Sequence, residues 1–280
     1  MSSPYPVPPP SYGASGTSPK RTQFSERDVQ EPLLGGPSTG GGGGIYEQPG
    51  PSELPDDFKY GVSVSECVVD IRAAFVRKVY TILSCQIFAT SILAGLISQS
   101  PDTIMWVQQH VWSIYVPMFG TFVVLFLLWW KRHSHPINFI LLSIFTLMEA
   151  FTLGVLVAFF NNTIVLQALL ITVGIFLGLT LFTLQTKWDF SGMGPFLFGG
   201  LIALLMTGLV GIFIPWGRTM DMFYAGGASL LFSGYIVYDT YMINNRLSPD
   251  EYILASISLY LDFINLFINI LRLLGDIQDH

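Results

Sequence analysis

Apolar residues dominate seven long segments of residues 59–280, and short polar connections separate each segment from the next. Each segment is close to the ~20 residues that a helix needs to cross a hydrocarbon core. The pattern predicts an all-α integral membrane protein with a bundle of seven transmembrane helices, in which short connections make consecutive helices antiparallel neighbours. The predicted spans are Val79–Gln99, Trp112–Trp130, Ile137–Phe160, Ile164–Leu184, Pro195–Ile214, Met222–Ile243 and Tyr252–Leu274.

The segment before the first span has an amphipathic pattern. Val64, Val68, Ile71 and Phe75 recur at helical spacing, with acidic and basic residues elsewhere on the helical wheel. This spacing predicts an amphipathic helix that begins near Val62 and runs into the first span.

Residues 1–58 have a low-complexity composition. They hold eleven of the seventeen prolines and ten of the twenty-seven glycines, including the runs 8–10 and 40–44. Such a segment cannot bury enough apolar surface to offset the entropy of ordering it. We expect a disordered, Pro/Gly-rich cytosolic tail, followed by the seven-helix domain over residues 59–280.

The overall composition excludes several classes of protein. Apolar residues make up 51% of the chain and charged residues 11%, against roughly 25% charged in soluble domains. A net charge of −6 with no basic excess gives no reason to expect a nucleic-acid partner. Cys67 and Cys85 are too few for a disulfide framework, and no Cys/His cluster suggests a metal cofactor.

The distribution of basic residues predicts the orientation. Lys and Arg cluster before the first span and after the second, whereas the connections on the other side hold few. The positive-inside rule then places the N-terminus in the cytosol, and seven spans place the C-terminus on the other side. All six tryptophans fall at predicted span ends, as expected for amphipathic indoles at the membrane interface.

The predicted spans contain three carboxylates, Glu149, Asp239 and Asp262. A charge at the bilayer centre costs at least ~2.5–3.5 kcal/mol, so such groups usually mark a pathway or a relay. Asp239 and Asp262 lie on consecutive antiparallel helices and could meet in the cytosolic half of the membrane. An adjacent pair would share a proton and titrate as a unit. On deprotonation it could supply part of a Ca²⁺ shell, which needs six to eight oxygens.

Polar residues follow one face of the last predicted span, which we expect to face the bundle interior. Ser258, Asp262, Asn265, Asn269 and Arg272 recur at intervals of four, three, four and three residues. Asn265 and Asn269 could either line an ion pathway or hold helices together. Glu149 could likewise pair within the bundle or line a pore, whereas Arg272 suits an anchor at the interface.

Two segments carry a resemblance to a known family. Tyr-Ile-Val-Tyr-Asp-Thr at 235–240 and Ser-Leu-Tyr-Leu-Asp-Phe-Ile-Asn-Leu-Phe at 258–267 resemble the transmembrane Bax inhibitor motif family. Further blocks at 77–80, 145–150, 183–191 and 247–252 look most like its lifeguard branch, in particular the Golgi anti-apoptotic subgroup. The resemblance covers about residues 59–280 and leaves out the tail.

The resemblance implies a seven-helix fold, a calcium leak across intracellular membranes and suppression of cell death. It also implies that Asp239 and Asp262 form a pH-sensing pair. An arginine latch on the first aspartate corresponds to Lys131 or Arg132 here. Prokaryotic relatives carry an acidic residue within the second span, which this chain lacks, so a calcium site would have to use another group such as Glu149. The implied locations are the endoplasmic reticulum, the Golgi or, in fungi, the vacuole.

Three functions stay open at this point. The first is a pH-gated Ca²⁺ leak channel, with lipid and Ca²⁺ as partners and no cofactor. The second is a non-conducting regulator that binds membrane proteins of stress or cell-death pathways. The third is an intramembrane aspartyl protease, but the Gly-x-Gly-Asp and Pro-Ala-Leu segments of such enzymes are missing. We therefore expect a protein that is not an enzyme.

Overall fold

The computed structural model describes residues 63–67, 69–110, 112–214 and 217–278. The chain divides into two units, residues 1–48 and 49–280, and all described residues belong to the second. The predicted tail, residues 1–58, lies outside the described residues.

The described part of the chain is helical, as predicted, and contains no strand. Its α-helices correspond to the seven predicted spans, with one additional short helix, α3. They are α2 (Val69–Ser98), α3 (Pro101–Gln109), α4 (Trp112–Lys131), α5 (Ile137–Val157), α6 (Asn162–Gln185), α7 (Gly194–Phe213), α8 (Arg218–Asn245) and α9 (Tyr252–Gln278). Short 3₁₀ turns, η1 (Val64–Glu66), η2 (Ser191–Met193) and η3 (Pro249–Glu251), precede α2, α7 and α9.

Six of the helices in the described ranges are long and apolar enough to cross a membrane, namely α2, α4, α5, α6, α7 and α9. The exception among the predicted spans is α8, which has 28 residues but many glycines, serines and tyrosines. The protein is therefore a helical integral membrane protein, and the count of seven spans stays a prediction.

The start of α2 differs from the expected boundary. A helix was predicted from Val62, but α2 begins at Val69, after the turn η1. The turn is held in place by its backbone, because the Val64 N–H donates to the Leu247 carbonyl at 2.9 Å. From Val69 to Ser98 the amphipathic segment and the first span form one uninterrupted helix. Phe75, on the predicted apolar face, is buried.

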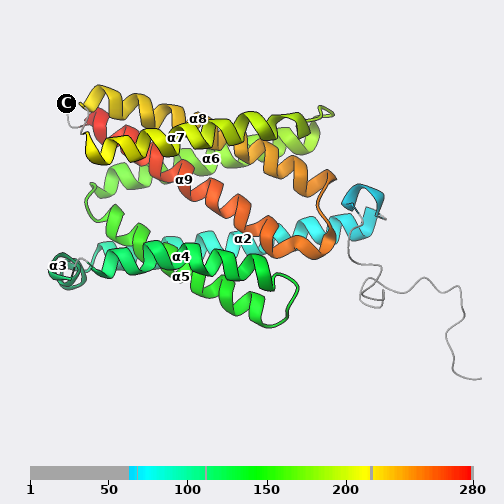
Figure 1. The fold of residues 1–280 in the computed structure, drawn as a ribbon, viewed down its shortest axis with the longest axis horizontal. Coiled ribbons are helices and arrows are strands. Elements are labelled where there is room, and N and C mark those ends of the chain that lie inside the picture. Colours follow the sequence, from blue (N-terminus) through cyan, green and yellow to red (C-terminus); the bar gives the residue numbers. More distant parts are fainter. Residues whose placement is uncertain (1–62, 68, 111, 215–216, 279–280) are drawn as a thin grey trace, which may run out of the picture. The chain divides into compact units, whose positions relative to one another are not determined.

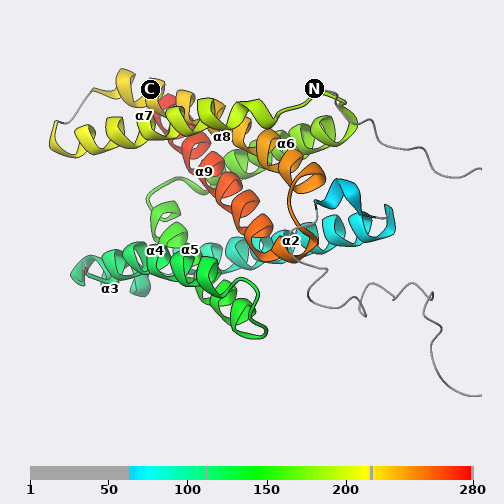
Figure 2. The same ribbon diagram turned by 45° about the vertical axis from the view of Figure 1, so that its right-hand side comes forward.

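Helix α9 is the core of the bundle. It packs against α2, α5, α6 and α8, and Figures 1 and 2 show it running between the α4–α5 pair and the α7–α8 pair. In its most apolar stretch 72% of the residues are buried, compared with 6% in α7. Both the polar and the apolar face of α9 are therefore covered by protein, while α7 keeps most of its surface for lipid.

Gly154 permits a close contact between α5 and α2. A Cβ on Gly154 of α5 would lie 2.9 Å from Ile97 Cβ and 3.0 Å from the Ala94 Cα of α2. Because real Cβ atoms do not approach so closely, only glycine allows α2 and α5 to pack at this separation. This contact fixes α2 and α5 as one wall around α9.

Candidate functional site: a carboxyl pair between two helices

Asp239 on α8 and Asp262 on α9 meet in the structure. Their carboxyls lie close enough to each other, and to the Ser258 hydroxyl beside Asp239, for hydrogen bonds to form. The short connection at 246–251 positions them, because it forces α8 and α9 to pack as an antiparallel pair. An ionised carboxylate can only accept hydrogen bonds, so a bond between two carboxyls requires that one of them hold a proton.

The pair lies in a largely buried setting between α8 and α9. Asp262 is buried, and its Oδ2 has no hydrogen-bond partner within the described residues. Tyr235 is close enough to both carboxyls to interact with them electrostatically. No basic side chain is among the partners of the pair in the part of the chain that the structure describes. Two negative charges in so buried a setting would repel each other, because the surroundings have a low dielectric constant.

The predicted arginine latch on Asp239 is not formed in this structure. Arg132 instead pairs with Glu251, with 3.3 Å between Nη1 and Oε1. Lys131, the other candidate, is exposed at the end of α4. The ion pair therefore links the end of α4 to the turn before α9, on the loop side of the carboxyl pair.

A second group of contacts surrounds Tyr252, the first residue of α9. The Lys78 ammonium lies 3.3 Å from the centre of the Tyr252 ring, a cation–π contact. The Tyr252 hydroxyl is hydrogen-bonded to His135 Nε2, and the two rings stack. Sequence analysis did not find this group, since its members are far apart in the chain and carry no common motif. It secures the start of α9 to α2 and to the α4–α5 connection.

Asn265, Asn269 and Arg272 of α9 have partners on α9 itself or on α8. The amides of Asn265 and Asn269 donate to the carbonyls of Leu261 and Asn265, each at 2.8 Å. These bonds stay within α9, so they satisfy the amides locally. Arg272 was expected to act as an interface anchor, but it forms an ion pair with Asp221 of α8 and lies 5.4 Å from the Tyr224 ring centre.

Comparison with known proteins supports the motif-based resemblance. The family described as "Inhibitor of apoptosis-promoting Bax1" matches residues 72–279. The chain belongs to this Bax inhibitor family. It is 48% identical to Bax inhibitor 1 of Schizosaccharomyces pombe over 225 residues, which are 80% of this chain and 85% of that protein. It is 42% identical to mouse Protein lifeguard 4 and 43% identical to the Golgi anti-apoptotic protein of Vaccinia virus strain Lister. Each of these matches covers 223 residues, which are 80% of this chain and 93% and 94% of the relatives.

Glu149 is not part of the carboxyl pair formed by Asp239 and Asp262. It lies on α5, where it interacts electrostatically with Tyr260. Within the described residues no group of three or more His, Cys, Asp or Glu side chains is arranged to hold a metal ion. The carboxyl pair alone falls far short of the six to eight oxygens of a Ca²⁺ site. The arrangement is thus suited to responding to protons, and Ca²⁺ binding by Asp239 and Asp262 stays a prediction.

Proposed function

We propose that this protein is a pH-sensitive Ca²⁺ leak pathway in an intracellular membrane and that it suppresses cell death by controlling stored Ca²⁺. The observation that carries the proposal is the contact of half-buried Asp239 with buried Asp262, which has no basic side chain among its partners in the described part of the chain. The names of the relatives, Bax inhibitor and anti-apoptotic protein, support the cellular outcome.

The pair converts a change of pH into a force between two helices. While the carboxyls share a proton, their hydrogen bond holds α8 against α9. Loss of that proton leaves two like charges in a medium of low dielectric, where they repel. The change acts where α8 meets the central helix, so it alters the packing around α9. A divalent cation passing between the helices would neutralise the same charges.

The experiment is Ca²⁺ efflux from proteoliposomes, measured from acidic to neutral pH. Asn keeps the shape of Asp but does not titrate, so Asp239→Asn and Asp262→Asn should each abolish the pH dependence of the flux. Asp102→Asn is the matched control, because Asp102 is an exposed carboxylate on α3, away from the pair. A wild-type pH profile in both pair variants, with monodisperse protein, would refute the proposal.

A non-conducting adaptor predicts a different result. Deletion of residues 1–58 removes the segment that is richest in proline and glycine and most suited to recognition by partners. Under our proposal the truncated protein keeps both Ca²⁺ efflux and protection from cell death. Loss of protection with unchanged efflux would favour the adaptor. The contact between the two carboxyls would also fit an aspartyl protease. Cleavage of a helical reporter peptide tests that activity directly.

A further inference from the structure

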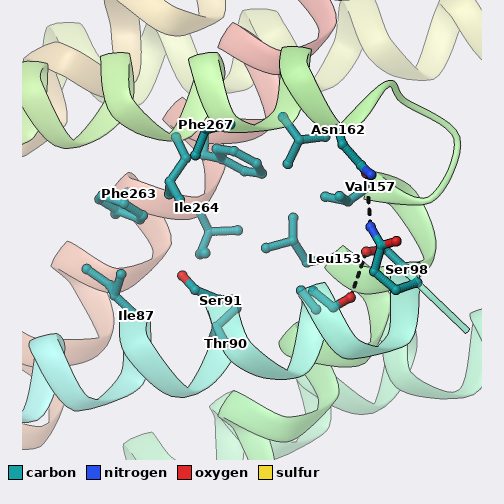
Figure 3. Close-up of a pocket in the computed structure, with 16 residues that line it drawn as sticks. Ile87, Thr90, Ser91, Ser98, Leu153, Val157, Asn162, Phe263, Ile264 and Phe267 are labelled. Carbon is teal, nitrogen blue, oxygen red and sulfur yellow. Dashed lines mark hydrogen bonds between the residues drawn. The ribbon is translucent and has the colours of Figure 1, made fainter.

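A cavity of about 370 Å³ lies between α2, α5, α6 and α9 (Figure 3). Its inner wall is formed by Phe263, Ile264 and Phe267 of α9, which are buried residues of the core. Helix α6 contributes a facing row of aliphatic side chains that includes Leu166 and Leu169. The volume is within the ~300–1,000 Å³ range of small-molecule sites.

The chemistry of the lining indicates an apolar occupant. None of the described residues that line the cavity is charged, and most of them are aliphatic or aromatic. The apolar part of such a wall favours contact with apolar molecules over water. An ion vestibule would instead require carbonyl groups or rings of charge along the wall.

The cavity is open towards the side of the bundle. Helix α2 packs mainly on α5 and α9, whereas α6 packs on α8 and α9, so α2 and α6 stand apart across the cavity. On this side Ser91 and Gly95 of α2 are exposed, and Leu166 of α6 is 57% exposed. A Cβ built on Gly95 meets no atom within 4 Å. In a membrane protein, this lateral opening faces lipid chains.

One end of the cavity is polar. There the Gln99 amide nitrogen donates to Asn162 Oδ1 at 3.0 Å and bridges α2 to α6, beside Ser98 (Figure 3). Gln99 directly follows α2 and Asn162 begins α6, so this rim lies at the helix ends. The turn η1 before α2 bonds to Leu247 in the α8–α9 connection, and Arg72 near the start of α2 bonds to Asn244 at the end of α8. The rim therefore lies at the opposite end of α2 from this connection. A molecule that fits has a polar end at the rim and an apolar body that extends to α9.

We propose that the cavity binds one acyl chain of a bilayer phospholipid, which enters between α2 and α6 from the leaflet at the Gln99–Asn162 end. The head group stays at the interface beside the polar rim, and the end of the chain lies against Phe263 and Phe267. This site is separate from the carboxyl pair and does not depend on the proposed Ca²⁺ leak.

Photolabelling of the full-length protein in phosphatidylcholine vesicles tests the proposal. The probe is phosphatidylcholine with a diazirine near the end of one acyl chain, and adducts are located by peptide mass spectrometry. Phe263 and Phe267 are 3% and 4% exposed, so bulk lipid reaches them only through the cavity. We expect adducts on the segment 263–267. A probe with the diazirine next to the head group should label the rim instead. Adducts confined to lipid-facing residues, for example on α7, would overturn the proposal.

A glycine substitution supplies the matched control. Gly95→Leu adds its bulk at a position on the cavity wall where a Cβ meets no atom within 4 Å, so it should block the cavity and abolish labelling of 263–267. Gly178→Leu makes the same change at an exposed position of α6 that is outside the cavity and has equally open surroundings. It should leave the labelling unchanged. Equal labelling of 263–267 in both variants would refute the site. Labelling by a diazirine fatty acid but not by the phospholipid would refute the proposed source of the chain.

Discussion

Tyr260 shows how a single polar group can be accommodated at the centre of a membrane bundle. Its ring is fully buried and lies edge-on to Phe145 of α5, with 5.9 Å between centroids. Its hydroxyl is hydrogen-bonded to Thr90 Oγ1 of α2 at 2.8 Å. One residue of α9 therefore joins two neighbouring helices, two positions before Asp262.

Tyr260→Phe should destabilise the protein by about 1 kcal/mol, because it leaves a buried hydroxyl without its partner. The double variant Thr90→Val, Tyr260→Phe should cost less than the sum of the single variants. The coupling should be about 0.6 kcal/mol, as for other hydrogen bonds within membranes. Reversible unfolding in mixed detergent micelles measures all four forms. Strictly additive losses would show that the two hydroxyls do not stabilise each other.

Asp189, in the connection between α6 and α7, has a local environment that favours its charged form. Hydrogen bonds from Ser191, including its backbone N–H at 2.9 Å, lower the pKa of the Asp189 carboxyl to about 2, with help from Tyr241 and Arg246. The folded-state pKa is below the ordinary value of 3.8. The stabilisation is therefore complete above pH 3.8 and is lost as the pH falls through about 2.

A carbon-detected NMR titration of the labelled Asp189 carboxyl should accordingly give a midpoint near 2. In Ser191→Ala the midpoint should rise towards 3.8, because the Ser191 side chain is the main cause of the shift. An unchanged midpoint in this variant would contradict the assignment of that cause.

At the scale of elements, the α2–α5 contact depends on one missing methyl group. Gly154→Ala places a Cβ within 3.0 Å of α2, which should cost ~1–3 kcal/mol through overpacking. Gly178→Ala adds the same methyl group where nothing lies within 4 Å. It should be neutral or stabilising, because alanine favours the helix by up to ~1 kcal/mol. Thermal unfolding in detergent should therefore show a lower midpoint for Gly154→Ala and an unchanged or higher midpoint for Gly178→Ala, and equal shifts would be inconsistent with a close α2–α5 contact.

Helix positions could be predicted well because a membrane span leaves a strong local signal. The ends of α4 through α9 agree with the hydrophobic pattern to within a few residues. The start of the first helix was predicted less well, because the helix was expected from near Val62 and α2 begins at Val69. The short helix α3 was missed because its nine residues are too few to show a clear period, although Ser100 caps it through the Thr103 N–H.

The candidate site could be predicted only in part. Asp239 and Asp262 stood out because carboxylates are rare in spans, and a short loop brings their helices together. The pairing of Arg132 with Glu251 could not be predicted, because the two residues are far apart in the chain and share no motif. The contacts of Tyr252 with Lys78 and His135 could not be predicted either, because they depend on how α2 and the α4–α5 connection approach α9.

For the molecule as a whole, α8 decides the topology. If α8 spans the membrane, the α8–α9 connection is cytosolic and the end of α9 lies on the other side. In a background with Cys67 and Cys85 replaced by serine, Ser248→Cys should react with an impermeant maleimide only from the cytosol. Gln278→Cys should react only from the opposite side. Reaction of both cysteines from one side would show that α9 does not cross the membrane as predicted.

Helix α9 is secured at both ends. Glu251 binds Arg132 just before the helix starts, and Arg272 binds Asp221 close to its end. Sliding α9 along its axis would break both ion pairs together. Helix α8 is likewise tied to α9 by the connection at one end and by Asp221 at the other, with Asp239 and Asp262 between these ties. If the proposed repulsion between the carboxyls occurs, it would act on α8 between two fixed ends and would therefore favour bending of α8 over sliding along α9.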